Sequence, residues 1–572
     1  MKRLIIISII TLFSFAIAGS SSAAEYIIPD KFVKEKPNKI ISERTYSYLS
    51  EKADAQNVKV WVYFTDKSVF KDSEFIEKAE LVYNSMTPEA RERRARNDAS
   101  PIRFEDLPVN QQYVDEIESY GLKLRRVIKW LNAASFETDL EKLEEIKDLP
   151  FVLKIKPVAA FTRPSPPESK ELDELNEVPD QKRDTHELSY GGTYSQLDQI
   201  NVVAAHDSGF SGEGIIVAMF DTGYRKDHLA FGNIISDGRL LAEYDFINND
   251  YETANEEGDV SNQWDHGTKT WSTLGGGWDG EIYGPAYGAS FVLAKTEDMT
   301  SETPVEEDNW AAAVQWADSI GVNIISSSLG YSDWYTYEDL DGNTCVITNA
   351  ADYAASVGIL VCNSAGNGGP SAGTITAPAD GDSVIAVGSV ESSGYLSYFS
   401  SKGPTYDDRI KPEVCARGSS TVCASPYTNT YITSASGTSL ACPLVAGAAA
   451  LVMEARPDFN VMEVREALML TASKAISPDN AYGWGIIDVM AAMNYMYVPD
   501  YLQGDANYDG NFNISDAVYI INHVFMDGDP PQPVMEAGDA NDDGEVNVSD
   551  AVFLINFIFI PGAPAPPGYD AG

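Results

Sequence analysis

The amino-acid sequence predicts an α/β protein: a central domain with a parallel sheet, preceded by a small α+β domain and followed by a small all-α module. Across residues 188–497, short apolar runs rich in β-branched residues alternate with helical patterns, which is typical of a parallel sheet covered on both faces. Residues 25–187 mix strand and helix patterns on a smaller scale, and residues 501–572 contain an internal repeat. The length of 572 residues is enough for roughly three or four domains.

The first 24 residues have the plan of a secretory signal peptide. Lys2 and Arg3 are followed by an apolar stretch from Leu4 to Ala18 and then by small residues up to Ala24. A membrane anchor is the alternative, but about 15 apolar residues are fewer than the ~20 that a spanning helix needs. We therefore predict a secreted protein, extracellular or associated with the cell surface, that has no membrane span once the signal is removed.

Residues 25–187 predict the small α+β domain and, after it, a linker. Strands are expected at 58–66, 122–127 and 151–157, and helices near 72–97 and 140–148. The basic run Arg91 to Arg96 is interpreted as one solvated helix face, and a processing site is the alternative. Residues 162–188 are rich in Pro and Glu, which predicts a linker.

Residues 188–497 predict the central domain. Strands are expected at 214–220, 291–295, 322–326, 358–362 and 384–387, and helices at 306–320, 345–356 and 439–455. In an open parallel sheet, chemically active residues gather at the carboxyl ends of the strands. The search for a site therefore begins where these strands end.

The charge of the chain is strongly negative and unevenly placed. The sequence has 41 Lys and Arg against 86 Asp and Glu, a formal charge of −45, and residues 188–572 account for −41 of it. Nucleic acids and anionic membrane surfaces are excluded as main partners, because both attract cationic proteins.

Five cysteines in an exported chain permit disulfides and leave at least one cysteine unpaired. Cys415 and Cys423 flank a short loop and are the pair that is easiest to close. Cys345 and Cys362 could meet at one end of an αβ hairpin. Cys442 lies in an apolar helical run and is interpreted as a small buried hydrophobic residue.

Three short motifs lie at strand ends or helix starts of the central domain: Asp221-Thr222-Gly223, Asp265-His266-Gly267-Thr268 and Gly437-Thr438-Ser439. Each alone is equally well explained by a turn, a structural histidine or a helix N-cap. Together, Asp221, His266 and Ser439 occur in a chain order known for nucleophilic triads. In such a triad Ser439 is the nucleophile, His266 takes its proton, and Asp221 fixes the imidazole tautomer.

With Ser364-Ala365-Gly366-Asn367 and Tyr482-Gly483-Trp484-Gly485 added, residues 190–497 resemble a subtilisin-like serine protease. The resemblance implies that Asn367 donates its side-chain amide to the oxyanion, assisted by the Ser439 N–H. The segment Ser326-Ser327-Ser328-Leu329-Gly330 resembles the substrate strand of the family, so Ser328, Leu329 and Gly330 are expected to pair with an extended peptide. A turn at Asn367 and a plain strand end at Gly330 are the alternatives.

Two further segments, Trp130-Leu131-Asn132-Ala133 and Leu149 to Ile155, resemble the inhibitory prodomain of these enzymes. The resemblance implies that residues 25–187 assist folding, place their C-terminal end in the substrate groove and are removed by autoprocessing between about Phe161 and Leu188. A prodomain rich in Lys and Arg suits a strongly acidic mature body. A permanent structural domain is the alternative.

Residues 501–572 contain two twelve-residue loops with oxygen ligands at positions 1, 3, 5 and 12. The candidate ligands are Asp505, Asn507, Asp509 and Asp516 in the first loop and Asp539, Asn541, Asp543 and Asp550 in the second. This spacing, with Gly at position 6, suits calcium. The paired repeats resemble a type I dockerin module, which implies a cohesin-like scaffold as partner, although the helices lack Lys and Arg. An acidic solvated tail is the alternative.

The sequence thus predicts a secreted serine endopeptidase that hydrolyses polypeptides through an acyl-enzyme, is made as an autoprocessed zymogen and carries a calcium-dependent docking tail. The alternative is a non-catalytic surface or scaffold-associated protein that binds peptides on a protease fold.

Overall fold

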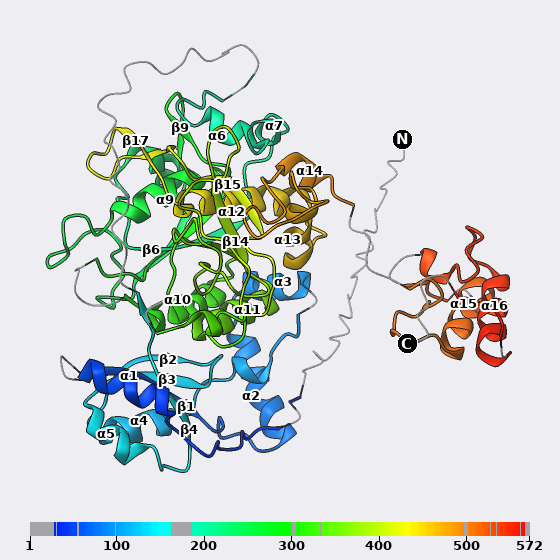
Figure 1. The fold of residues 1–572 in the computed structure, drawn as a ribbon, viewed down its shortest axis with the longest axis horizontal. Helices are drawn as coiled ribbons and strands as arrows, with labels where there is room; N and C mark the ends of the chain where they lie inside the picture. Colours follow the sequence, from blue (N-terminus) through cyan, green and yellow to red (C-terminus); the bar gives the residue numbers. More distant parts are fainter. Residues whose placement is uncertain are drawn as a thin grey trace, which may run out of the picture. The chain divides into compact units, whose positions relative to one another are not determined.

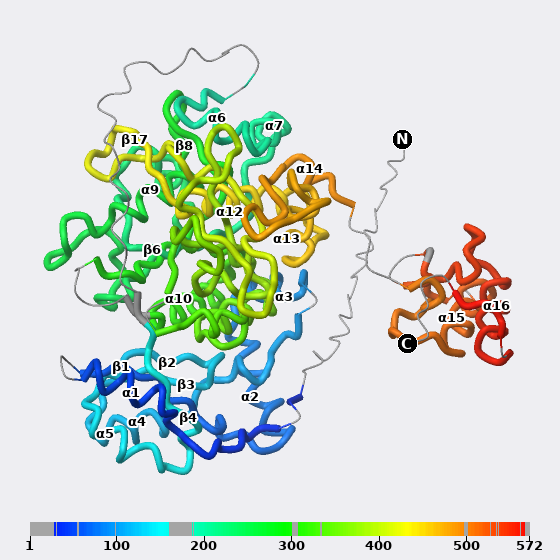
Figure 2. The backbone as a smooth tube through the Cα atoms, in the orientation of Figure 1, coloured from blue at the N-terminus to red at the C-terminus, as the bar shows by residue number. Residues whose placement is uncertain are grey.

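The computed structural model describes residues 28–161, 186–299, 305–496 and 502–566, apart from positions 30, 54–56, 98, 187, 332–333, 527, 533–534 and 561. The predicted signal peptide and nearly all of the predicted linker lie outside the described residues. The chain forms two compact units, residues 1–494 and 495–572 (Figures 1 and 2). The first unit contains the N-terminal and central domains in contact with each other.

The N-terminal domain is built on a four-stranded antiparallel sheet. In spatial order the strands are β2 (Lys123–Ile128), β3 (Ala133–Thr138), β1 (Val58–Phe64) and β4 (Val152–Pro157). Val60 and Val62 of β1 pack beneath α1 (Glu43–Ala53), α4 (Gln111–Ser119) and α5 (Leu140–Ile146). Trp61 and Tyr63, on the opposite face, pack against the central domain. Both faces of β1 are therefore buried, which explains its nearly continuous apolar sequence.

The helix predicted near residues 72–97 is two helices, α2 (Asp72–Ser85) and α3 (Pro88–Arg96). The Thr87 hydroxyl accepts a hydrogen bond from Ala90 N at 3.2 Å, and Pro88 occupies the first turn, so a new helix begins there. The interpretation of the basic run as a solvated face is wrong: Arg93 and Arg94 are each only 2% exposed. These two guanidinium groups are buried because they form ion pairs with Asp318 and Asp106.

The central domain is built on a seven-stranded parallel sheet, as predicted. In spatial order its strands are β15 (Val414–Arg417), β14 (Ile385–Val390), β13 (Leu360–Ser364), β12 (Ile324–Ser327), β6 (Ile216–Asp221), β10 (Ser290–Lys295) and β7 (Leu240–Asp245). Ala218 and Phe220 of β6 pack beneath α10 (Glu307–Ile320) and α11 (Val346–Ser356), and Val217 and Met219, which alternate with them, are equally buried. Both faces of the sheet are therefore covered.

Four longer helices of the central domain form two packed pairs (Figure 1). One pair is α9 (Asp265–Gly275) and α12 (Thr438–Ala455), and the other is α10 (Glu307–Ile320) and α11 (Val346–Ser356). The sheet of the N-terminal domain packs on α10 and α11, and its Trp61 and Trp130 share one apolar cluster with Trp310. The two domains therefore share a core.

Shorter elements complete the central domain. They are α6 (Tyr194–Asp198), α7 (Val202–Asp207), α8 (Gly232–Ser236), α13 (Val461–Leu470), α14 (Val489–Met493), β8 (Gly277–Trp278), β9 (Ile282–Tyr283), β16 (Thr421–Ala424) and β17 (Ile432–Ala435). Within the described residues, only α12 is long and apolar enough to cross a membrane, and 89% of it is buried in the domain. Its burial is that of a core helix.

The disulfides that the sequence permits are not formed, because all five cysteines are free and buried. Cys415 lies on β15 of the large sheet, whereas Cys423 lies on β16, which pairs only with β17. The Cys345 thiol donates to the Asp339 carbonyl at 3.3 Å, away from Cys362. Cys442 is fully buried, as predicted, with its sulfur 3.4 Å from the Cys362 carbonyl oxygen.

The second unit is helical, as predicted. Its helices α15 (Ile514–Met526) and α16 (Val548–Phe559) pack together, and each follows one of the acidic loops. Within the described residues, the apolar cluster of this unit has few fully buried members: Ala506, Ala517, Ile520, Ala540, Ala551 and Leu554. So small an apolar core supplies little stability by itself.

Candidate active site

Asp221 is the last residue of β6, at the carboxyl end of the parallel sheet. Its side chain is 1% exposed, and both carboxylate oxygens have fixed contacts. Oδ1 accepts the Thr222 N–H at 2.7 Å, and Oδ2 accepts the Thr270 hydroxyl at 2.8 Å. These donors stabilise the charged form and hold the carboxylate in one orientation.

His266 lies in the first turn of α9, facing Asp221. Its Nδ1 is 2.6 Å from Asp221 Oδ1, and its side chain is 13% exposed. Because a carboxylate only accepts, Nδ1 carries the proton in the neutral imidazole, and Nε2 is the basic nitrogen.

Gly267 explains how α9 comes so close to the end of β6. A Cβ at this position would lie 2.2 Å from the Gly223 carbonyl oxygen. Any other residue would therefore push α9, and with it His266, away from Asp221. Position 267 thus requires a glycine because α9 and the end of β6 pack so closely together.

Ser439 is the second residue of α12 and is 7% exposed. The Ser328 hydroxyl donates to the Ser439 carbonyl at 2.9 Å, and the Ser439 hydroxyl faces the Ser328 carbonyl at a long 3.5 Å. The start of α12 is therefore fastened to the segment that follows β12. This long contact leaves the Ser439 hydroxyl only weakly held by its neighbour.

Asn367 lies in the loop after β13 and is fastened to the start of α12. Its Oδ1 accepts the Thr438 N–H at 2.9 Å and the Thr438 hydroxyl at 3.1 Å. Because a backbone N–H only donates, the oxygen end of the amide must face Thr438. The Nδ2 end of Asn367 is therefore the end that can donate a hydrogen bond. The side chain is held in this orientation by Thr438, the residue that precedes Ser439.

The predicted substrate segment, Ser328 to Gly330, directly follows β12 in the centre of the sheet. The Leu329 carbonyl accepts the Asn363 side-chain amide at 2.8 Å. A Cβ on Gly330 would lie 2.3 Å from the Thr376 hydroxyl oxygen, so this segment passes close to the loop that contains Thr376. The segment is thus held firmly, next to Ser439.

The sequence reasoning missed one polar residue of this site, Thr270. It lies one helical turn after His266 on α9, and its hydroxyl reaches the Asp221 carboxylate. The signal was present, because residues four apart share one face of a helix. A polar side chain at this position on a largely buried helix would have been the clue.

The end of the N-terminal domain runs beside the start of α10. β5 (Ala160–Phe161) pairs antiparallel with β11 (Val305–Glu306). Next to it, the buried Glu307 carboxylate accepts Ala159 N–H at 3.0 Å, Trp61 Nε1–H at 2.9 Å and the Tyr335 hydroxyl at 2.6 Å. Burial raises the pKa of Glu307 to about 7. The chain thus leaves the N-terminal domain as a strand along the central domain.

The two acidic loops of the second unit turn their carboxylates inward. Asp505 accepts the backbone N–H groups of Asp509 at 3.0 Å and Gly510 at 2.8 Å, and Asp516 accepts that of Asn513 at 2.9 Å. The second loop repeats these contacts with Asp539, Asp543, Gly544, Asp550 and Asn547. The two loops therefore have the same conformation.

The donor set of these loops fits calcium. Asp505 and Asp516 are buried, and residues 501–572 contain no Lys or Arg to balance them. Burial, together with the charges of Asp505 and Asp509, raises the pKa of Asp516 to about 6. Inward-facing carboxylates without a cationic side chain suit a hard divalent cation with oxygen ligands.

A second acidic group lies in the central domain. Asp245, Asp250 and Glu256 place carboxylate oxygens within 4.8 Å of one another and could hold a metal ion. The Lys295 ammonium lies 2.7 Å from Asp245 and 2.8 Å from Asp259, so it supplies positive charge there.

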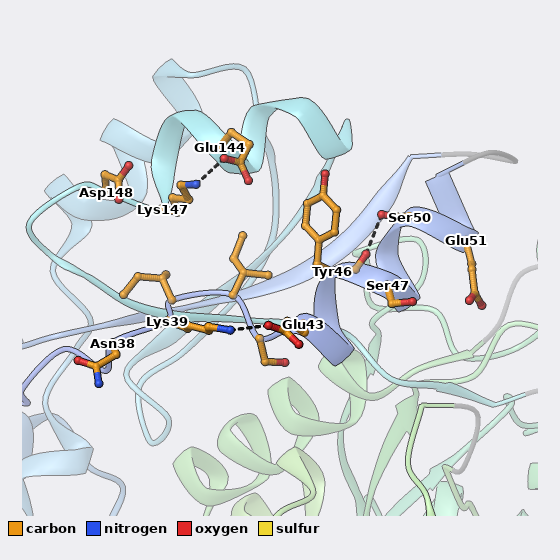
Figure 3. Close-up of a pocket in the computed structure, with 13 residues that line it drawn as sticks. Asn38, Lys39, Glu43, Tyr46, Ser47, Ser50, Glu51, Glu144, Lys147 and Asp148 are labelled. Atoms are coloured by element: carbon orange, nitrogen blue, oxygen red, sulfur yellow. Dashed lines mark hydrogen bonds and ion pairs between the residues drawn. The ribbon is translucent and has the colours of Figure 1, made fainter.

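A hollow on the N-terminal domain is unrelated to this site. It lies between α1 and α5, where Lys39 pairs with Glu43 and Lys147 pairs with Glu144 (Figure 3). None of the predicted catalytic residues lines it.

Comparison with known proteins identifies the family of each part of the chain. The model of the Subtilase family matches residues 212–485, the Peptidase S8 propeptide domain of Bacteroidota matches 59–172, and the Dockerin type I domain matches 503–559. Subtilisin E of Bacillus subtilis (strain 168) is 30% identical over 381 residues, which are 66% of this chain and 85% of that protein.

Two further relatives are similar over a shorter part of the chain. Serine protease AprX of Bacillus subtilis (strain 168) is 30% identical over 329 residues, 52% of this chain and 70% of that protein. Subtilisin DY of Bacillus licheniformis is 33% identical over 309 residues, 53% of this chain and 98% of that protein. The fold and these relatives define a serine endopeptidase. The chain belongs to the subtilase family, with an N-terminal propeptide domain and a C-terminal dockerin module.

Proposed function

We propose that Asp221, His266 and Ser439 are the catalytic residues of this protease. The observation that carries the proposal is the 2.6 Å contact between His266 Nδ1 and Asp221, at the sheet end where α12 presents Ser439. The contact between Ser439 and Ser328 supports the third role, because Ser328 follows β12, the strand that pairs with β6. A structural histidine would not require the serine and the carboxylate to be placed around it.

The reaction follows from these roles. The Ser439 oxygen attacks the carbonyl carbon of the scissile peptide bond while His266 Nε2 takes the hydroxyl proton. His266 then gives this proton to the leaving amine, the C–N bond breaks, and an ester remains on Ser439. A water molecule, deprotonated by His266, hydrolyses the ester. Asp221 stabilises the imidazolium throughout and stays ionised.

The oxyanion of the tetrahedral intermediate is bound by Asn367 Nδ2 and the Ser439 N–H. The orientation of Asn367 supports this role, because Thr438 holds its Oδ1 and leaves Nδ2 as the donor. Loss of one such donor costs about 2.7 to 4 kcal/mol of transition-state stabilisation, a magnitude measured for subtilisin itself.

The substrates are polypeptides bound in extended form along Ser328, Leu329 and Gly330. Residues 25–187 act as prodomain and are removed by the chain's own activity between about Phe161 and Leu188. The β5–β11 pairing supports this order, because it leads the chain along the central domain immediately before that segment. The prodomain is therefore the first polypeptide that the protease binds.

The C-terminal module binds calcium through Asp505, Asn507, Asp509 and Asp516 and through Asp539, Asn541, Asp543 and Asp550. It attaches the secreted enzyme to a cohesin-like scaffold outside the cell. The inward-facing carboxylates of both loops support the ligand set. Bound calcium supplies the positive charge that these carboxylates otherwise lack.

Replacement of Ser439 tests the proposal. The Ser439→Ala variant is expected to lose labelling by a fluorophosphonate probe, digestion of casein and maturation of its own precursor. Ser436→Ala, which changes an exposed serine three residues earlier, serves as the matched control and retains all three. If Ser439→Ala matures in isolation and still digests casein, the assigned nucleophile is wrong.

The second candidate function, a peptide-binding protein without catalysis, predicts no labelling of the unaltered chain. Mass spectrometry of the secreted protein reports removal of the signal and of the prodomain together. A secreted product that retains residues 25–187 would contradict the zymogen.

A further inference from the structure

Helix α3 of the prodomain lies against the C-terminal ends of three helices of the catalytic domain. Arg93 reaches the ends of α10 and α11, and Arg96 reaches the end of α12. These two arginines are three residues apart, so they project from one face of α3. The C-terminal end of α12 lies about 25 Å from Ser439, because a helix rises by 1.5 Å per residue. This contact is therefore remote from the catalytic residues.

Arg93 is almost completely enclosed by backbone carbonyls and one carboxylate. Its Nε donates to the Val357 carbonyl at 3.1 Å, just after α11, and its Nη1 donates to the Val322 carbonyl at 3.0 Å, just after α10. Its Nη2 forms an ion pair with Asp318, in the last turn of α10. A guanidinium group is suited to this site because its donors point in several fixed directions.

Arg96 makes the corresponding contacts at α12. Its Nη2 donates to the carbonyls of Met453 at 3.1 Å and Arg456 at 2.9 Å, and its Nε donates to Phe459 at 3.1 Å. The last carbonyls of a helix lack intrahelical partners and carry partial negative charge. Arg96 therefore supplies hydrogen-bond donors to carbonyls at the C-terminal end of α12, the helix whose N-terminal end carries Ser439.

Asp318 is the charged centre of this contact. Besides Arg93, it lies 3.4 Å from Arg94 and 3.6 Å from Lys129, which come from two different elements of the prodomain. Arg94 also pairs with Asp106 of the prodomain at 2.7 Å. In the described residues, one catalytic-domain carboxylate is thus surrounded by three cationic side chains of the prodomain.

The surface of the catalytic domain is also shaped for α3. A Cβ on Gly321 would lie 2.5 Å from the Glu89 Cβ, and a Cβ on Gly358 would lie 2.5 Å from the Asn97 amide nitrogen. Both glycines have positive φ, +99° and +88°, which already favours glycine after a helix. The close approach of α3 is a second requirement at the same two positions.

We propose that Asp318 and the carbonyls of Val322, Val357, Met453, Arg456 and Phe459 form an arginine site. It recognises a helix that presents two arginines three residues apart and holds the prodomain independently of the substrate cleft. The proposal rests on the proposed function only for the role of residues 25–187 as prodomain. After the linker is cut, the arginine site holds the prodomain at this remote face and slows its dissociation.

The test measures how fast the cut prodomain leaves. A recognition sequence for a sequence-specific protease is placed between residues 168 and 178 of the full-length Ser439→Ala chain, and the added protease cuts it. Dissociation of the prodomain is then followed by size-exclusion chromatography after dilution. Because Ser439 is absent and the cut is external, the result does not depend on whether Ser439 is catalytic.

Arg93→Lys keeps the charge but loses the directed donors, and Arg96→Ala removes three contacts to carbonyls. Each is expected to speed dissociation at least tenfold, because each leaves carbonyls of the arginine site unpaired, buried ones at Arg93 and partly buried ones at Arg96. The matched control is Arg91→Ala on the same helix, whose guanidinium contacts Asn84 and Tyr83 of the prodomain. It is expected to leave the rate within twofold.

Equal rates for Arg93→Lys, Arg96→Ala and Arg91→Ala would overturn the proposal. Arg96 is only partly buried and belongs to no ion pair within the described residues, so Arg96→Ala decides the question if Arg93→Lys does not fold. Thermal unfolding of each precursor before cutting shows which variants are folded.

Discussion

Asp221 depends on donors from two elements, and only one of them belongs to its own strand end. Thr222 follows it in the chain, whereas Thr270 reaches it from α9, the helix that also carries His266. Thr270 is therefore a positioning residue: it fixes the carboxylate relative to the imidazole and touches no substrate atom. A hydrogen bond to a charged group contributes about 1.5 to 3 kcal/mol.

Thr270→Val keeps the shape of the side chain and removes this donor. We expect kcat to fall at least tenfold with little change in KM, because the loss affects the transition state more than substrate binding. Thr270→Ser retains the hydroxyl and is the control. Steady-state kinetics of the mature enzymes on a peptide substrate measure both constants, and an unchanged kcat in Thr270→Val would remove Thr270 from the site.

We expect Glu307 to make the folding stability of the precursor depend on pH. Burial raises its pKa to about 7 from a usual value of 4.5, so the folded precursor favours the protonated form. The unfolded chain releases this proton at lower pH, and the stability that Glu307 contributes therefore falls as pH rises from about 4.5 through about 7.

Glu307→Gln is expected to remove this part of the pH dependence. Thermal unfolding of the Ser439→Ala precursor near pH 5 and near pH 8 measures it, and the difference between the two midpoints should shrink in the variant. Glu338→Gln, at an exposed carboxylate of the same domain, is the control and should leave the difference unchanged. The same difference in both variants would contradict the role of Glu307.

At the scale of helices and strands, the sequence predicts an element best when its own residues decide its burial. Five strands of the central sheet, β6, β10, β12, β13 and β14, are largely apolar, and the sequence predicts their positions to within a few residues, whereas the edge strands β7 and β15 were not predicted. The strand β3 was not predicted, because Ala133 to Thr138 is short and is not strongly apolar in sequence. It is buried because it lies between two other strands of the sheet. β7 was missed for a related reason, because it is a half-exposed edge strand.

α3 shows the limit of charge patterns. Its composition is that of a solvated helix, yet Arg93 and Arg94 are buried because another domain offers carbonyls and a carboxylate. Nothing within the helix itself indicates that partner. The same holds for Thr270 and for the free cysteines, whose surroundings come from elements distant in the sequence. Asp221, His266 and Ser439, in contrast, are candidates that the sequence itself offers, because they stand at strand ends and helix starts and because the motifs around them resemble those of a known family.

On the scale of the whole molecule, the two compact units differ in what holds them together. The first unit has a large shared core, whereas in the described part of the second unit the apolar cluster has only six fully buried residues. Its acidic loops add repulsion between carboxylates, which bound cations would relieve. The stability of the second unit should therefore depend on calcium far more than that of the first.

A chelator is expected to unfold residues 502–566 and to leave the first unit folded. Circular dichroism of the full-length Ser439→Ala chain should show a partial loss of helix, with one of two thermal transitions removed and restored by added calcium. Asp516→Asn with Asp550→Asn should reproduce the loss without chelator. Asp529→Asn, outside both loops, is the control, and equal helicity with and without chelator would contradict the prediction.

The prodomain contacts α10 at both ends: Arg125 pairs with Asp308 at 2.8 Å in the first turn, and Arg93 pairs with Asp318 in the last. One residue inserted between them would shift Asp318 by about 1.5 Å and turn it by about 100° around the helix axis. The prodomain could then form its ion pair at only one end of α10, with Asp308 or with Asp318. The number of residues in α10 is thus constrained by a domain that takes no part in the chemistry, and we expect an insertion that the catalytic domain alone tolerates still to weaken its contact with the prodomain.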